Sequence, residues 1–319
     1  MSTARERLVE DEKTSFPRQQ ARTRRFSLGV PRNFMVSPDG ERVVFLRSPA
    51  GDHPGTSLWV YYVATGTERE VAGARQALGE GEEQLPDEER ARRERSRELA
   101  GGITAYACDE AVRHAAFALN GRLWWVGLDH DAGAEAVELP APGGVVDPHP
   151  DPTGEAVAFL SGPALYVVRT AGDGPPLVIA DEQGANGLAD VTWGAAEFIA
   201  AEEMDRLRGF WWAPDGRSLL AARVDNRPVP IWWTNDPSEP GTTPRAHRYP
   251  AAGEADAVVS LWHIELSARD AAAPEGGRRQ QVSWDCERYP YMVAVHWSRS
   301  GPPLLLVEQR DHKACAVLS

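Results

Sequence analysis

The feature that most restricts the fold of this chain is a short apolar strand, a tight turn and a second strand, repeated along the sequence. Asn120-Gly121 is a strong hairpin signal, because both residues tolerate the positive φ angles of a type I′ turn. Turns that contain proline and end in glycine precede three strands, at residues 37–40, 151–154 and 213–216. The paired segments are Val43–Leu46 with Leu58–Val63, Ala115–Leu119 with Arg122–Val126, Ala156–Leu160 with Ala164–Val168 and, less clearly, Val295–Gly301 with Leu304–Val307.

The spacing of this repeat indicates a β-propeller. Phe117 and Phe159 are 42 residues apart, which is close to the length of one four-stranded blade. We therefore predict an all-β fold, in which residues 1–30 form an N-terminal extension and residues 31–319 form part of a propeller with about five blades. The chain has 11 tryptophans, several of them in pairs, and we expect them to pack between blades rather than to form a ligand cage.

Two expansions interrupt the repeat. In the first, at about residues 75–102, Pro86 precedes three acidic residues and then several arginines. This order favours a helix, because acids suit its positive end and bases its negative end, so we predict an exposed helical insertion between blades one and two. The second runs to about Ala257 and contains the segment Ala201–Arg206 and a proline-rich loop, Asn226–Pro250. Loops on a rigid scaffold often carry function.

Charge and composition exclude several classes of protein. The net charge of −13 argues against nucleic acid as a partner. Three cysteines without CxxC spacing favour a reducing compartment, and the charged N-terminus lacks the apolar core of a signal peptide. No apolar run approaches the roughly 18 residues of a membrane span, and the histidines show no metal-ligand spacing. We expect a cytoplasmic location, no membrane partner, no metal and no cofactor.

Two segments carry a family resemblance. Residues 196–216, AEFIAAEEMDRLRGFWWAPDG, resemble the double-glutamate motif of the dipeptidyl peptidase IV family. In that motif a glutamate pair is followed by Asp-Arg, then glycine, an aromatic residue and Trp-Trp-x-Pro. Residues 85–97, LPDEERARRERSR, with Gly102–Tyr106 after them, are similar to the arginine-bearing helical segment of the same family, especially of its bacterial and cytosolic members.

The resemblance implies an eight-bladed propeller that covers an α/β-hydrolase domain of a serine peptidase. The family removes dipeptides from free peptide N-termini and favours Pro or Ala at the second position. By this resemblance Glu202 and Glu203 bind the α-ammonium group of the substrate. An arginine of the insertion contacts the substrate backbone, and Arg93 and Arg97 are the two candidates.

The chemistry of such a clamp is simple. An ammonium group has three N–H donors and one positive charge, so two adjacent carboxylates can share it through charge-assisted hydrogen bonds. Without a ligand the two carboxylates repel each other, and the arriving cation relieves that repulsion. A blocked N-terminus lacks the charge, so the clamp would recognise only free peptide ends.

The nucleophile of this family lies in a Gly-x-Ser-x-Gly elbow, and the 319 residues contain no such pentapeptide. We therefore expect an incomplete propeller, a fragment without the C-terminal hydrolase domain, that is inactive by itself. We also expect that the full-length protein can form a homodimer. One alternative is a protein-interaction propeller without a protease role, which would give Glu202 and Glu203 no function. Another is a prolyl oligopeptidase or acylaminoacyl peptidase, which would not need paired acids.

Overall fold

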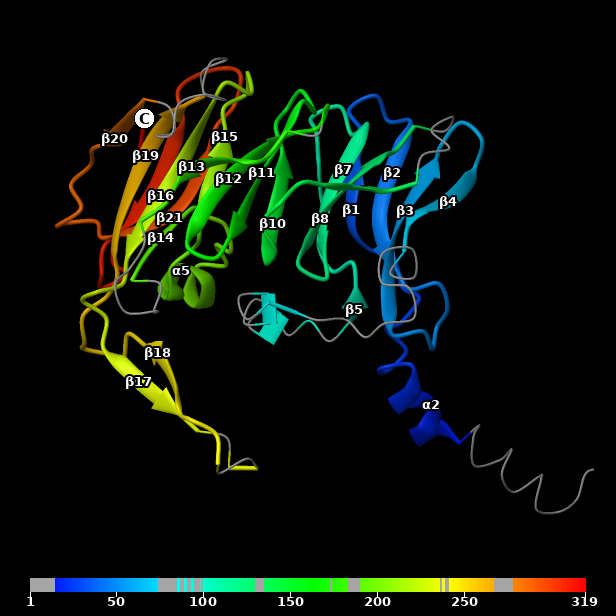
Figure 1. Cartoon of the computed structure of the whole chain (residues 1–319), viewed down its shortest axis with the longest axis horizontal. Helices are drawn as coiled ribbons and strands as arrows, with labels where there is room; N and C mark the ends of the chain where they lie inside the picture. The colour runs from blue at the N-terminus through cyan, green and yellow to red at the C-terminus, as the bar shows by residue number, and fades with distance from the viewer. Residues whose placement is uncertain are drawn as a thin grey trace, which may run out of the picture. The chain divides into compact units, whose positions relative to one another are not determined.

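The computed structural model places the chain in two compact units, Met1–Leu139 and Pro140–Ser319, which are treated separately below. Its elements are labelled in Figure 1. The structure describes residues 15–73, 85–86, 89–90, 93–94, 98, 100–129, 135–172, 174–182, 190–235, 237–238, 241–266 and 278–319.

The first unit contains two antiparallel sheets, preceded by helix α2 (Phe16–Arg22). One sheet has the order β1-β2-β3-β4, and the short strand β5 pairs in parallel with β3. The other has the order β6-β7-β8-β9. The strands are β1 (Arg32–Val36), β2 (Arg42–Arg47), β3 (Gly55–Tyr62), β4 (Thr67–Ala72), β5 (Gly101–Gly102), β6 (Ala107–Cys108), β7 (His114–Leu119), β8 (Arg122–Gly127) and β9 (Val137–Leu139).

The second unit contains three antiparallel sheets, a separate two-stranded hairpin and helix α5 (Phe198–Glu203). The sheets have the orders β10-β11-β12-β13, β14-β16-β19-β20 with β15 also paired to β16, and β21-β22-β23. Their strands are β10 (Val145–Pro150), β11 (Ala156–Ser161), β12 (Ala164–Arg169), β13 (Leu177–Ala180), β14 (Val191–Trp193), β15 (Phe210–Trp212), β16 (Ser218–Asp225), β19 (Val258–Glu265), β20 (Arg279–Val282), β21 (Tyr291–His296), β22 (Leu304–Glu308) and β23 (Cys315–Leu318).

The turns expected from the sequence are present. Asn120 and Gly121 have φ angles of 55° and 69° and join β7 to β8, where Leu119 lies opposite Arg122. Each of the three proline-containing turns closes with a hydrogen bond from the amide of its glycine to the carbonyl three residues before, at 2.8–3.1 Å. Local chemistry therefore sets the hairpins of this fold.

Apolar side chains hold neighbouring sheets together within each unit, as expected for propeller blades. In the first unit, Val44 and Leu58 of one sheet share a buried cluster with Phe117 of the other. In the second unit, Leu165 of the β10–β13 sheet shares a cluster with Leu219 of the next sheet. Leu220, on the opposite face of the same strand, packs with Met292 and Leu305 of the β21–β23 sheet. The all-β, blade-like prediction is confirmed.

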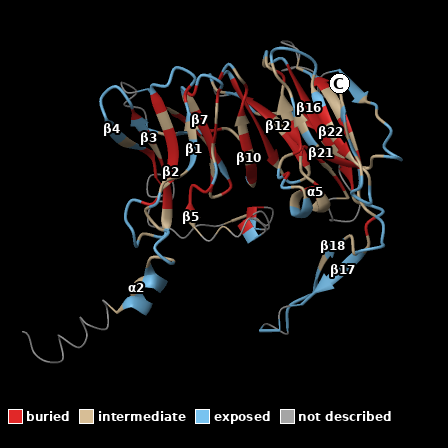
Figure 2. Ribbon diagram, turned by 180° about the vertical axis from the view of Figure 1, so that it is seen from behind, coloured by how far each residue is buried: buried red, intermediate tan, exposed pale blue. Residues whose placement is uncertain are grey.

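The segment predicted as a proline-rich loop, Asn226–Pro250, instead contains the hairpin β17 (Ile231–Thr234) and β18 (Arg245–Arg248). The two strands pair in register from Ile231–Arg248 to Thr234–Arg245. The interpretation of every tryptophan pair as core is also wrong here, because Trp232 and Trp233 on β17 are 51% and 65% exposed. Figure 2 shows this hairpin as largely exposed, in contrast to the buried strands of the sheets.

The predicted helical insertion lies mostly outside the residues that the structure describes. Of those it describes there, Glu89, Arg90, Arg93 and Glu94 are helical, but Glu89 and Arg93 are buried rather than exposed. None of the helices in the described part of the chain is long and apolar enough to span a membrane.

Candidate functional site

Helix α5 carries the glutamate pair, and its first turn is capped by its own sequence. The buried carboxylate of Glu197, just before the helix, accepts a hydrogen bond from the amide of Ala200 at 2.9 Å. After the helix, Asp205 adopts a positive φ of 52°, a region that aspartate tolerates better than most residues. This turns the chain back, and the amide of Arg206 donates to the carbonyl of Ala200 at 2.9 Å.

Arg206 fixes the helix to the neighbouring sheet. Its guanidinium is 6% exposed and donates to the carbonyls of Met292, on β21, and Arg208, at 2.9 and 2.8 Å. It also faces the Glu197 carboxylate at 3.4 Å. Burial raises the pKa of Glu197, although the Ala200 amide and the Arg206 charge oppose that rise. The Asp-Arg pair of the motif is therefore the anchor of the helix.

The remaining motif residues build the scaffold behind the helix. A Cβ at Gly209 would lie 2.4 Å from the carbonyl oxygen of Ala195, so only glycine fits there. Phe210 is 1% exposed. Trp211 packs on the cluster shared with the β21–β23 sheet, whereas Trp212 packs on the cluster shared with the β10–β13 sheet. Successive residues of a strand face opposite sides, so Trp-Trp on β15 contacts a neighbouring sheet on each side.

Glu202 and Glu203 differ from the buried residues Glu197, Arg206 and Phe210, because both side chains are exposed. They occupy the last turn of α5, which has no basic residue. The carbonyl end of a helix carries partial negative charge and disfavours carboxylates, by roughly 0.3–1 kcal/mol each. Two acids at this end are therefore unfavourable for the helix alone, and they create a negative potential that suits a cation.

Aromatic side chains lie beside the glutamate-bearing helix. Phe198, the first residue of α5, meets the ring of Tyr249 edge to face at 5.2 Å, and Tyr249 meets Trp232 of β17 in the same way at 5.4 Å. The β17–β18 hairpin is in turn held by Arg248, which pairs with Asp190 and donates to the carbonyl of Val229 at 2.7 Å. No sequence pattern predicted that Tyr249 and Trp232 would lie near α5, because both lie in the segment expected to be a loop.

The structure describes only one of the two arginines that are candidates for a contact with the substrate. Arg93 is buried, with its Nε 2.8 Å from the Glu89 carboxylate and its terminal nitrogens 3.3 Å from the carbonyls of Ala100 and Gly102. Arg97 lies outside the described residues. Arg93 belongs to the first compact unit and the two glutamates to the second, so each is described only within its own unit. A substrate contact from either arginine stays a prediction.

With this geometry established, comparison with known proteins identifies the class. Residues 103–319 match the family described as the dipeptidyl peptidase IV (DPP IV) N-terminal region, and the chain belongs to that family. Among solved structures it is similar to dipeptidyl peptidase 4 from Porphyromonas gingivalis, with a TM-score of 0.60 and 18% sequence identity. That similarity concerns the fold. It covers 90% of this chain but only 37% of the Porphyromonas chain, so the present chain spans well under half the length of that relative.

Proposed function

We propose that this chain is the substrate-binding, non-catalytic part of a serine dipeptidyl peptidase, in which Glu202 and Glu203 bind the free α-ammonium group of a peptide. One observation carries the proposal. In the motif that contains them, Glu197, Arg206, Gly209, Phe210 and the two tryptophans pack within the unit, whereas the side chains of both glutamates are exposed on the last turn of α5, where the helix carbonyls disfavour carboxylates. Membership of the family supports the same assignment.

In the complete enzyme the clamp would set the position of cleavage. A peptide held by its ammonium group presents a fixed length of chain to the catalytic residues of a hydrolase domain, so dipeptides with Pro or Ala at the second position would be released. Arg93 or Arg97 would contact the peptide backbone. A cytoplasmic location and a homodimer of the complete enzyme belong to the same proposal.

The proposal is tested by calorimetric titration of the purified chain with Ala-Pro-Ala and with its N-acetyl form. The free peptide should bind and the acetylated one should not. Glu202→Gln or Glu203→Gln should weaken binding by about tenfold or more, since each removes a charge and one charge-assisted acceptor. Glu155→Gln is the matched control, because Glu155 is an exposed acid of the same unit, 3.7 Å from Arg169. Equal binding of the free and acetylated peptides would refute the clamp and favour an interaction propeller.

A further inference from the structure

A pocket of about 240 Å³ lies in the first unit, on the side where β1 begins and β2 ends. Its wall includes three arginines, Arg24, Arg32 and Arg47, but a single acid, Glu98. Among the described residues of this wall, arginines therefore outnumber acids, in a chain whose net charge is −13. The described residues that line it all belong to the first unit, and none of them lies on helix α5.

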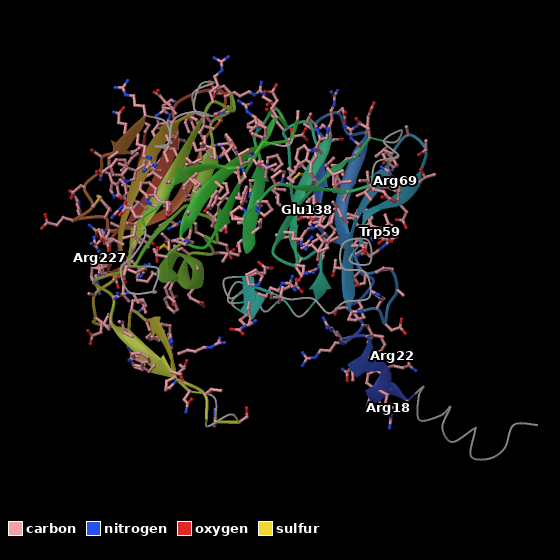
Figure 3. All side chains as sticks on the ribbon, viewed as in Figure 1. Arg18, Arg22, Trp59, Arg69, Glu138 and Arg227 are labelled. Carbon is pink, nitrogen blue, oxygen red and sulfur yellow. The ribbon has the colours of Figure 1, made fainter. Side chains whose placement is uncertain are left out.

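The arginines are fixed to different degrees. Arg32 pairs with Glu98 through one terminal nitrogen, but its other terminal nitrogen, Nη2, is buried and has no hydrogen-bond partner among the described residues. Arg47 is held by Glu68 at 2.6 Å and lies over the ring of Trp59 at 4.1 Å; Figure 3 labels Trp59. A buried donor of a charged group without an acceptor is costly. Arg32 Nη2 therefore lacks the acceptor that a buried charged donor normally has.

Two hydroxyl groups add to this set. Ser48 and Thr56 line the same pocket and are only 5% and 2% exposed. Neither hydroxyl forms a hydrogen bond within the part of the chain that the structure describes, and neither oxygen is among its fully buried atoms without a partner. Arg47 lies opposite Ser57 in the β2–β3 pair, so Ser48 and Thr56 follow at the open end of that pair. Hydroxyls of largely buried residues normally have partners, so both are candidates to donate to a ligand in the pocket that they line.

We propose that this pocket binds a small oxyanion, either a phosphate group or a carboxylate group of a small molecule. The planar guanidinium of Arg32 offers N–H donors in the geometry that both groups accept. The hydroxyls of Ser48 and Thr56 donate to the remaining oxygens, and three arginines against one glutamate among the described lining residues disfavour a cation. Phosphate and carboxylate share this chemistry, so the experiment distinguishes them.

The test is calorimetric titration of the whole chain with sodium phosphate and, separately, sodium malonate, against sodium chloride at a matched ionic strength of about 0.15 M. At least one of the two oxyanions should bind saturably with one site per chain. Arg32→Gln and Thr56→Val should each weaken that binding about tenfold or more, since each removes a donor to the anion. Thr56→Val keeps the shape of the side chain, so it reports on the hydroxyl even if Arg32→Gln loses stability with its Glu98 pair.

Arg122→Gln is the matched control, because Arg122 is an exposed arginine of the same unit, paired with Glu138 at 2.9 Å outside the pocket. It should bind like the wild type. Binding of phosphate alone or of malonate alone supports the site and identifies its ligand class. The proposal is overturned if neither anion binds saturably, or if Thr56→Val and Arg32→Gln chains that retain the wild-type melting temperature bind as tightly as Arg122→Gln.

Discussion

The guanidinium of Arg206 contacts three separate segments of the chain: a strand of the next sheet, the segment that follows α5 and the residue that caps α5. It bonds to Met292 on β21, to Arg208 in the following segment and to the cap residue Glu197. The sequence motif includes this arginine but gives no reason for it, because its main partner lies 86 residues further along the chain. Long-range partners of this kind leave no periodic pattern in a sequence, whereas the cap at Glu197 is local.

Replacing Arg206 with glutamine should lower the free energy of unfolding of the second unit by about 3 kcal/mol. The substitution removes the positive charge that faces the buried carboxylate of Glu197. Removing one partner of a buried ion pair is strongly destabilising, because the other charge stays buried without compensation. Urea unfolding followed by tryptophan fluorescence measures the change. Arg169→Gln, which breaks an exposed pair in the same unit, should change stability by less than about 1 kcal/mol. A similar small loss for Arg206→Gln would show that the guanidinium does not anchor α5.

At the scale of elements, the sequence predicted what local chemistry determines. The predicted strands on either side of Asn120-Gly121 and of Gly162-Pro163 are confirmed, because the turns between them set the register of the hairpins. The β17–β18 hairpin was missed because prolines dominate residues 226–250 and because its strands carry few buried residues. The assignment of Glu202 and Glu203 to peptide binding came from the motif and stays a prediction. Their exposure and the aromatic neighbours of α5 did not follow from the sequence.

The tryptophans of β14 and β17 differ in burial, and this difference predicts how much each contributes to stability. Trp193 on β14 is 2% exposed and packs beside Trp262 and under Arg279, so Trp193→Ala should cost about 3–5 kcal/mol of stability. Trp233 on β17 is 65% exposed, and Trp233→Ala should change stability by no more than about 0.5 kcal/mol. Urea unfolding of both variants, followed by far-UV circular dichroism, provides the comparison. A loss for Trp233→Ala as large as that for Trp193→Ala would mean that the hairpin is part of the core.

At the scale of the whole chain, the prediction concerns binding without cleavage. A dipeptidyl peptidase needs two separate functions: a group that recognises the peptide end and a nucleophile that attacks the carbonyl carbon. In the function proposed above, the exposed acids at the end of α5 recognise the peptide end, and this role requires only a rigid support. The second requires a strained strand-to-helix turn that exposes a serine, and no Gly-x-Ser-x-Gly pentapeptide occurs in these 319 residues.

The 319-residue chain should therefore hydrolyse neither Gly-Pro nor Ala-Pro p-nitroanilide, while it still binds free Ala-Pro-Ala if the proposed function is correct. Release of nitroaniline is followed by absorbance, and a parallel sample treated with a serine-directed fluorophosphonate identifies turnover by a contaminating hydrolase. Labelling of the chain itself by the fluorophosphonate, together with turnover that scales with its concentration, would show that the catalytic group lies on this chain outside any motif of the family. Binding without turnover would separate recognition of the peptide end from catalysis, as expected when the glutamate pair and the nucleophile reside in different domains.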